Sequence, residues 1–446
     1  MSRLPPLLAA IAAVAAAAAL SARAAPGETD VGPVPSPSDT VGPHPVIKPV
    51  DKHLIPTLQV ARAKGWAAGE KPVAAAGMAV NALATGLNHP RWLCVLPDGD
   101  VLVAETNAPP KPEDARGLKG KVMKSVQKKA GAGAPNANRI VLLRDADGDG
   151  VAETKTVFID ALNAPFGMVL VGEDLYVADT DAVLKFAYKP GETSVAEPGV
   201  KLTDLPAGAI NHHWTKNIIA SPDGSKLYAT TGSNSNAGDN GIAAEQGRAR
   251  IWEIDRATGQ KHDFATGIRN PNGMAWVGDT LWTVANERDE LGDDLPPDYL
   301  TSVKPGGFYG FPWSYWGQHV DDRVKPPRPD MVAKAIVPDY GLGAHVAALG
   351  LVAAARTALP APFANGMFIG EHGSWNRKPP VGYKVVFVPF EGGRPAGMPV
   401  DVLTGFVDDK GEAHGRPVGV AIDTKGALLV ADDVGNTVWR VTGAAR

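Results

Sequence analysis

Adjacent histidines lie ahead of a β-rich run, in a position where a loop would end. His212 and His213 occupy the segment NHHWT, residues 211–215. Histidine is the side chain whose charge changes near neutral pH, which makes either residue a candidate general base. The alternative is an ordinary polar residue at a loop-to-strand junction, and the position alone does not separate the two interpretations.

A second polar segment, RNPNG, residues 269–273, stands in a similar relation to the next β-rich run. The Arg269 guanidinium could pair with a planar carboxylate, and Asn270 adds an amide beside it. Bridging of neighbouring structural units is the alternative role for the arginine. Comparable positions before consecutive β-rich runs predict that both segments contribute to one site.

Residues 286–294, NERDELGDD, place five carboxylates within eight residues. Such acids repel one another unless water or a hard cation neutralises them, and Ca²⁺ prefers oxygen ligands of this kind. We therefore expect either a solvated loop or a Ca²⁺ site, with these candidate ligands: Asp289, Glu290, Asp293 and Asp294.

The segment DADGDG, residues 145–150, begins like an EF-hand loop, with acids at loop positions 1, 3 and 5 and glycine at 6. Position 12 is Thr156 instead of glutamate, and no helices are predicted beside it. A tight acidic turn is therefore expected, with a structural Ca²⁺ as the alternative.

Further cations follow later in the chain. His372, Arg377 and Lys378 come directly after a β-rich run, and Arg416 precedes the last one. They are expected either at the same site or as exposed loop charges. The sequence contains no G-x-S-x-G elbow, Walker loop or Rossmann glycine fingerprint, so the usual residues of serine hydrolases, NTPases and nicotinamide enzymes are missing.

A repeated pattern indicates the elements that hold these loops. A turn rich in glycine, aspartate or asparagine precedes a short β-rich run at six comparable points, Leu102, Leu175, Leu227, Leu281, Phe368 and Leu428. Such units resemble propeller blades, which bury their faces only by stacking around a ring. The predicted fold is all-β, a six-bladed β-propeller with long loop insertions at the channel rim, including residues 309–359. A Lys-rich insertion, residues 116–129, is expected to be a solvated excursion.

The N-terminal part differs from the rest in composition. Residues 1–24 carry an early Arg3, an apolar run and a small-residue cleavage pattern, which predicts a secretory signal peptide and a periplasmic or secreted protein. Residues 25–77 are expected to be a flexible Pro-rich lead-in and first segment, and residues 78–446 the propeller domain. No membrane span is expected after cleavage.

Charge and cysteine content narrow the partners. The net charge of −4 shows no basic stripe, so nucleic acid is not expected, and a small molecule is the default substrate. Cys94 is the only cysteine, which rules out an intrachain disulfide and a haem attached through two thioethers. Electrons released by an oxidation would pass to an external acceptor, a quinone or a cytochrome.

Taken together, these motifs resemble those of a known family. NHHWT (211–215) with SPDG (221–224), RNPNG (269–273), NERD (286–289), FYGFP (308–312) and GEHGSWNR (370–377) are similar to motifs of soluble pyrroloquinoline quinone (PQQ)-dependent sugar dehydrogenases, in the sorbosone dehydrogenase-like branch. The resemblance runs from about residue 83 to residue 441. Each motif is weak alone, and the combination is specific.

The resemblance implies a six-bladed propeller that carries PQQ over its central channel with Ca²⁺ beside it. It implies that His213 removes a substrate proton while hydride passes to the quinone, with His212 as the other candidate. Arg269 and Asn270 would contact the quinone oxygens, and carbonyl oxygens near Asp289 and Glu290 would hold Ca²⁺.

The sequence departs from the family pattern at several positions. Val418 stands where glucose-oxidising relatives carry a second arginine after the position of Arg416, and Arg288 stands where they carry a glutamine. The family lysine on the quinone has no clear counterpart, which leaves His372, Arg377 and Lys378 as candidates. A sugar or aldehyde such as sorbosone is therefore a better expectation than glucose.

Other functions remain open on the same fold. One alternative is a Ca²⁺-dependent lactone or ester hydrolase, which would need acidic and asparagine side chains that converge on the channel from several blades. Another is a non-catalytic carbohydrate-binding propeller, because a fold alone does not fix a function.

Overall fold

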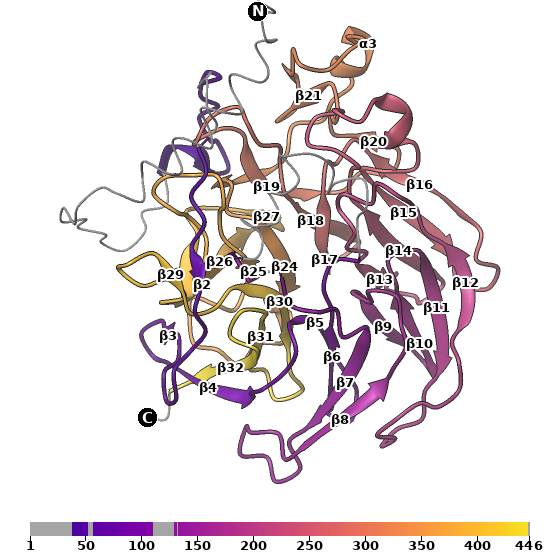
Figure 1. The fold of residues 1–446 in the computed structure, drawn as a ribbon, viewed down its shortest axis with the longest axis vertical. Coiled ribbons are helices and arrows are strands. Elements are labelled where there is room, and N and C mark those ends of the chain that lie inside the picture. Colours follow the sequence, from indigo (N-terminus) through magenta and orange to yellow (C-terminus); the bar gives the residue numbers. More distant parts are fainter. Residues whose placement is uncertain (1–37, 52–56, 110–128, 132, 445–446) are drawn as a thin grey trace, which may run out of the picture.

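The computed structural model describes residues 38–51, 57–109, 129–131 and 133–444. Six sheets surround a common centre, and each contributes one blade of four neighbouring antiparallel strands (Figure 1). This arrangement confirms the prediction of an all-β, six-bladed propeller. The predicted signal peptide, residues 1–24, lies outside the described residues, as does the Lys-rich insertion apart from its last residue.

Blades one to three occupy the first half of the ring. Blade one comprises β5 (Pro90–Val95), β6 (Val101–Glu105), β7 (Arg139–Arg144) and β8 (Thr154–Ile159). Blade two comprises β9 (Met168–Val171), β10 (Asp174–Ala178), β11 (Ala182–Ala187) and β12 (Val200–Asp204). Blade three comprises β13 (Ile218–Ala220), β14 (Lys226–Thr231), β15 (Arg250–Asp255) and β16 (Lys261–Thr266).

Blades four to six complete the ring. Blade four comprises β17 (Pro271–Val277), β18 (Thr280–Ala285), β19 (Pro297–Ser302) and β23 (Tyr340–Ala344). Blade five comprises β24 (Ala348–Ala353), β25 (Gly366–Glu371), β26 (Lys384–Glu391) and β28 (Val400–Thr404), and β27 (Arg394–Pro395) pairs with β26. Blade six comprises β30 (Pro417–Ile422), β31 (Leu428–Asp432), β32 (Thr437–Gly443) and β4 (Met78–Ala84).

Burial explains why the second strands of the blades stand out in the sequence. Every residue of β6, β18, β25 or β31 except Thr280 is buried, because these strands lie between neighbouring blades. Strands covered on both faces become continuous apolar runs without alternation. Outer strands such as β12 are largely exposed, and their sequences are correspondingly polar.

Blade six closes the ring by joining the two ends of the propeller. Its outer strand is β4, which pairs antiparallel with β32, so that Val80 lies opposite Val441 (Figure 1). Val80 and Val441 are both buried in the same apolar cluster. The ring is therefore held shut by residues that are more than 350 positions apart.

The lead-in differs from the expected flexible segment. Within it, η2 (Ser38–Thr40) and β1 (Val41–Gly42) dock on β23, β2 (Arg62–Ala63) pairs with β29 (Glu412–Ala413), and β3 (Val73–Ala74) pairs with β28. Trp66 donates its Nε1–H to Asp432 Oδ2 at 2.7 Å. In the part of the lead-in that the structure describes, short strands therefore pair with β23, β28 and β29, whereas the Pro-rich composition suggested flexibility.

The insertion of blade four lies between β19 and β23. It contains β20 (Gly307–Phe308), β21 (Ser314–Tyr315), β22 (His319–Val320) and the short α3 (Pro329–Val332). β20 pairs in parallel with β16 of blade three, which leads this segment along the neighbouring blade. Blade strands resume at Tyr340, so the insertion ends earlier than the predicted residue 359.

Helices are few among the described residues. Besides η2 and α3 the structure contains η3 (Ile242–Glu245) and η4 (Ala354–Arg356). None of the helices in the described part of the chain has the length and apolar content needed to cross a bilayer.

Candidate active site

All residues predicted to act together lie at one end of the propeller. Because consecutive strands of a blade are antiparallel, the segment before the first strand and the loop between the second and third strands share the same end. We call this end the loop face. It carries the predicted site residues, which precede β13, β17 or β30 or follow β18 or β25: His213, Arg269, Asn270, Arg288, Asp289, Glu290, Asp293, Asp294, His372, Arg377, Lys378 and Arg416.

His213 is held in a defined orientation. Its Nδ1 atom lies 2.9 Å from the Ser233 carbonyl oxygen and 3.0 Å from Ser233 Oγ. The carbonyl can only accept a hydrogen bond, so Nδ1 carries the proton in the neutral ring and Nε2 carries the lone pair. The His212 ring stands edge-on at 4.7 Å between ring centroids. His213 therefore has the tautomer that a general base needs.

Asn270 lies directly beside His213. A Cβ atom added to Gly232 would collide with both Asn270 Oδ1 and the His213 Cβ atom, so only glycine fits between these side chains. Asn270 donates to Asn286 Oδ1 at 3.2 Å, whereas its own Oδ1 is buried without a hydrogen-bond partner. A buried amide oxygen of this kind is suited to meeting a ligand donor.

Arg269 is buried and largely engaged by the protein. It donates through Nε to the Asn236 carbonyl at 2.9 Å and through Nη1 to the Glu287 carbonyl at 2.7 Å. Nη2 bonds Asn236 Oδ1 at 3.0 Å and lies 3.6 Å from Asp289 Oδ2. Burial lowers the pKa of Arg269, although the carboxylates of Asp289 and Glu287 oppose this effect.

Arg288 does not face the site, which corrects its prediction as a quinone contact. Its side chain is fully buried and bonds Glu287 Oε2 at 3.0 Å, Asp321 Oδ2 at 3.1 Å and the carbonyls of Pro312 and Ser314. The guanidinium also lies over the rings of Phe311 and Tyr315, 5.3 and 5.6 Å from their centroids. Arg288 fastens the blade-four loop to the insertion.

Asp289 is the centre of a cluster that we call the Asp289 cluster, made of Arg269, Asp289, His345 and Asn376. Asn376 donates to Asp289 Oδ1 at 2.7 Å, and His345 Nδ1 lies 3.6 Å from the same atom. Burial opposes the charge on Asp289, but His345 and Arg269 outweigh it and lower the Asp289 pKa. Burial likewise acts against His345, yet Asp289 raises the pKa of this histidine. The His345 ring and the Asp289 carboxylate are therefore buried partners that favour each other's charged forms.

The other acids of the predicted metal loop are also paired with protein groups. Arg377 bonds Asp294 Oδ1 at 2.7 Å and the Asp293 carbonyl at 3.0 Å. Lys48 of the lead-in lies 3.4 Å from Asp294 Oδ2. The backbone N–H of Lys378 donates to Asp293 Oδ2 at 3.2 Å, while the Lys378 side chain is exposed.

The predicted Ca²⁺ site therefore does not fit this loop. The carboxylates of Asp289, Glu290, Asp293 and Asp294 do not gather into a group that could hold a metal. Three of them, all except Asp293, lie within ion-pair distance of an arginine from another segment. The described residues that do gather are Asp145, Asp147, Asp149 and Glu153, whose ligand atoms lie within 4.8 Å of one another. They belong to the β7–β8 turn, at the opposite end of blade one from the loop face.

A second cluster, the Asp433 cluster, comprises His89, Arg91, His372, Arg416 and Asp433. Arg91 Nη1 lies 2.6 Å and His372 Nε2 lies 2.9 Å from Asp433 Oδ2. The Asp433 carbonyl contacts His89 Nδ1 at 3.0 Å. The Arg416 guanidinium lies over the Tyr383 ring, 5.0 Å from its centroid, and donates from Nη2 to the Tyr383 hydroxyl oxygen at 2.9 Å.

The Asp433 cluster carries net positive charge near neutral pH. Burial lowers the pKa of His372 to about 4 and also lowers that of His89, so both rings are neutral there. Burial opposes ionisation of Asp433, but the neighbouring histidines and Arg91 lower its pKa below the usual range. Arg91 pairs with the Asp433 carboxylate, and the Arg416 guanidinium lies near enough to act on His372 and His89. The Nε atoms of Arg91 and Arg416 are buried without hydrogen-bond partners. Such a cluster could hold an anion.

The loop between β25 and β26 connects the two clusters. It contributes His372 to the Asp433 cluster and Asn376 to the Asp289 cluster. The sequence analysis missed Asp433, His89, Arg91, His345 and Asn376 as site residues. Their positions along the chain could have identified them. Each lies just before or at the start of the first strand of a blade, or just after the second strand, as the predicted residues do.

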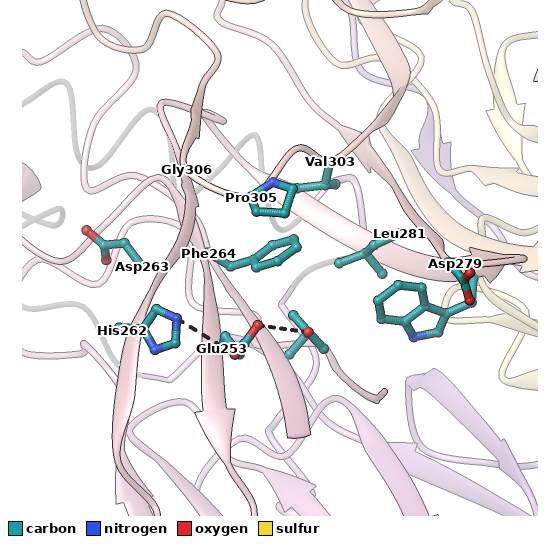
Figure 2. A pocket seen from close by; sticks show the side chains of 11 residues that line it. Glu253, His262, Asp263, Phe264, Asp279, Leu281, Val303, Pro305 and Gly306 are labelled. Atoms are coloured by element: carbon teal, nitrogen blue, oxygen red, sulfur yellow. Dashed lines mark hydrogen bonds and ion pairs between the residues drawn. The ribbon is translucent and has the colours of Figure 1, made fainter. Parts of the chain in front are cut away.

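A separate cleft of about 540 Å³ lies between blades three and four (Figure 2). Phe264 and Leu281 line its middle, and Glu253 lies between His262 and the hydroxyl of Tyr228, which donates to it at 2.8 Å. Asp279, in the hairpin between β17 and β18, places the cleft toward the end opposite the loop face. None of the predicted site residues lines it.

Comparison with known proteins agrees with the fold. The sequence profile of the TrAA12-like family matches residues 136–305 and 331–444. An iodide structure of the Trichoderma reesei enzyme of carbohydrate-active family AA12 shares 20% identity, covers 87% of this chain and 100% of that chain, and superposes with a TM-score of 0.68. The holo form of the pyranose dehydrogenase PQQ domain from Coprinopsis cinerea shares 20% identity over 86% of this chain and 100% of that chain, with a TM-score of 0.65.

A curated relative adds no function. An uncharacterized protein of Borreliella burgdorferi is 30% identical over 241 residues, which are 53% of this chain and 62% of that protein. The chain thus matches less than two thirds of that relative's length.

Proposed function

Because the chain belongs to the TrAA12-like family, we propose that it is a PQQ-dependent dehydrogenase of a sugar, an aldose or a sugar aldehyde such as sorbosone. The observation that carries this proposal is that the loop face holds both His213, in the tautomer of a general base, and the positively charged Asp433 cluster. The structural likeness to sugar dehydrogenases supports the fold on which such a site would be built. The predicted signal sequence supports export to the periplasm or beyond.

The residues of the loop face suit a planar polycarboxylate such as PQQ. Arg91 and Arg416 offer buried N–H groups without partners, which carboxylates could accept. Asn270 offers an unpartnered amide oxygen beside His213, and Arg269 supplies positive charge behind it. These residues would hold and orient the quinone.

When bound, PQQ supplies the electrophilic quinone that takes up a hydride from the substrate. His213 would accept at Nε2 the proton of the hydroxyl on the carbon that loses the hydride, which for an aldehyde substrate is a hydroxyl of its hydrate. The contacts of Nδ1 with Ser233 keep the ring in this tautomer and stabilise the imidazolium that forms. Ca²⁺ has no part in this scheme, because the predicted metal loop is already neutralised by protein cations. The electrons leave to an external acceptor, a quinone or a cytochrome.

The proposal is tested by adding PQQ to the purified full chain and measuring reduction of an artificial electron acceptor with aldoses, aldehydes and sorbosone. We expect His213→Gln to lower kcat at least ~100-fold, as removal of a general base does, while the Kd for PQQ changes little. His262→Gln, at a largely exposed histidine of blade three, is the matched control. His212→Gln separates the two adjacent histidines.

Three outcomes contradict the proposal or the role it gives to His213. Lactone or ester hydrolysis without PQQ would favour the hydrolase alternative. Carbohydrate binding without acceptor reduction, under conditions in which PQQ is bound, would favour the non-catalytic propeller. A full rate in His213→Gln would remove this residue as the base.

A further inference from the structure

Positively charged side chains of the protein contact the loop that the sequence suggested as a Ca²⁺ site. Arg323 of the blade-four insertion donates from Nη1 to the Asp289 carbonyl at 3.0 Å, and Asn236 Nδ2 donates to the same oxygen at 3.1 Å. Arg323 also lies 4.0 Å from the Glu290 carboxylate. The backbone oxygen that the family resemblance assigned to the metal therefore already accepts two hydrogen bonds, one of them from a cation.

Arg323 is fixed in this position by a buried partner. Its Nε and Nη2 atoms bond the two oxygens of Asp321 at 2.8 and 2.7 Å, which is the bidentate geometry of a strong ion pair. Arg288 Nη1 lies 3.1 Å from Oδ2 of the same carboxylate, the oxygen that Arg323 Nη2 also binds. The guanidinium of Arg323 is thus preorganised against the loop instead of moving in solvent.

Other segments neutralise the remaining carboxylates. Asp289 faces Arg269 of blade three's last loop and His345 ahead of blade five, at 3.6 Å each. Asp294 faces Arg377 and, from the lead-in, Lys48. A divalent cation at this loop would have to displace these groups and would meet their positive charge.

We propose that the loop 286–294 binds no metal and that Arg323 takes over the positioning role of Ca²⁺ beside the cofactor. The role of Arg323 beside the cofactor rests on the proposed PQQ-dependent function. Whether the loop binds a metal can be measured independently of that function. Arg323 is a positioning residue: it acts by holding the Asp289 segment and its charge, and not by contact with the substrate.

The test compares PQQ binding, by quenching of tryptophan fluorescence, with excess EDTA and with millimolar Ca²⁺. For the wild-type chain we expect the Kd to change less than about twofold, because no ion is exchanged. Arg323→Met should weaken PQQ binding in EDTA about tenfold, as expected for loss of a hydrogen bond from a charged group, and added Ca²⁺ should restore part of it. Arg328→Met, at an exposed arginine of the same insertion paired with Asp330, is the matched control.

A second readout separates this inference from the proposed function. Ca²⁺ is titrated into the chain without PQQ while Tm is followed, in an Asp147→Asn background that disables the acidic group of the β7–β8 turn. If Tm does not rise, the inference is supported even when PQQ fails to bind. A failure of PQQ to bind would refute only the proposed function. A Ca²⁺-dependent rise, or a tenfold loss of wild-type PQQ affinity in EDTA, would overturn the inference.

Discussion

Glu371 shows at the scale of one residue how the fold changes an ionisable group. It ends β25 with 2% of its surface exposed, and its Oε2 atom has no hydrogen-bond partner among the described residues. Burial raises the pKa of Glu371 to about 8, against an opposing effect of Lys384. Folding thus favours the protonated form, so the stability that this group contributes is present below the ordinary glutamate pKa and is lost as the pH rises through about 8.

We expect Glu371→Gln to remove this loss, since an amide stays neutral. The variant should be more stable than the wild type by ~1–3 kcal/mol at pH 8.5, the range for relief of an unsatisfied buried group, with little difference at pH 5. Tm measured across this pH range checks the expectation. Glu391→Gln, at the exposed end of β26, is the control, and an equal effect at both pH values would contradict the argument.

At the scale of elements, the blade-four insertion supports the loop face from outside. Arg288 carries this link because it joins the loop after β18 to Pro312, Ser314 and Asp321 of the insertion. Its partners are buried, so none of them can turn to water if the guanidinium is removed. The loop that holds Asp289 therefore depends on a neighbouring element and not on its own sequence alone.

Arg288→Met should destabilise the chain strongly, because it leaves the charges of Glu287 and Asp321 buried with fewer partners. We expect a decrease of ~3–5 kcal/mol in the free energy of unfolding, the range for a broken buried ion pair. Arg328→Met removes an exposed pair that solvent screens, so it should leave the free energy of unfolding nearly unchanged. Urea unfolding of both variants is the measurement, and similar small losses would show that Arg288 is not a structural link.

At the scale of the whole molecule, closure of the ring decides stability. The outer strand of blade six comes from the start of the domain, and Val80 in it is 5% exposed between blades. A charge at this position would have no partner in the apolar cluster that contains Val441. The same substitution in an outer strand away from the closure provides a direct comparison.

We expect Val80→Asp to lower the free energy of unfolding by at least ~3 kcal/mol, since it buries an unpaired carboxylate. Val200→Asp in β12, where the valine is 64% exposed, should change it by less than about 0.5 kcal/mol. Thermal unfolding followed by circular dichroism measures both. Equal Tm values for the two variants would mean that β4 is not needed to hold the ring shut.

The repeated blades and the loops that share one face could be predicted from the amino-acid order alone. Second strands such as β6 and β31 are buried on both sides. Their sequences are therefore continuous apolar runs, and the number of such runs predicts the number of blades. His213, Arg269 and Arg416 could be placed together because each precedes the first strand of a blade. These features depend on local periodicity, which a sequence displays directly.

The partners of the charged groups, by contrast, became known only from the three-dimensional arrangement. The type of Arg288 suggested a ligand contact, yet the insertion surrounds it, and the acids after it suggested a metal, yet Lys48, Arg323, His345 and Arg377 neutralise them. The lead-in was expected to be flexible because a Pro-rich composition does not reveal backbone pairing with distant strands. In the described residues it pairs with β23, β28 and β29. Electrostatic partners act across short distances in space, and a closed ring brings together residues whose separation along the chain gives no sign of it.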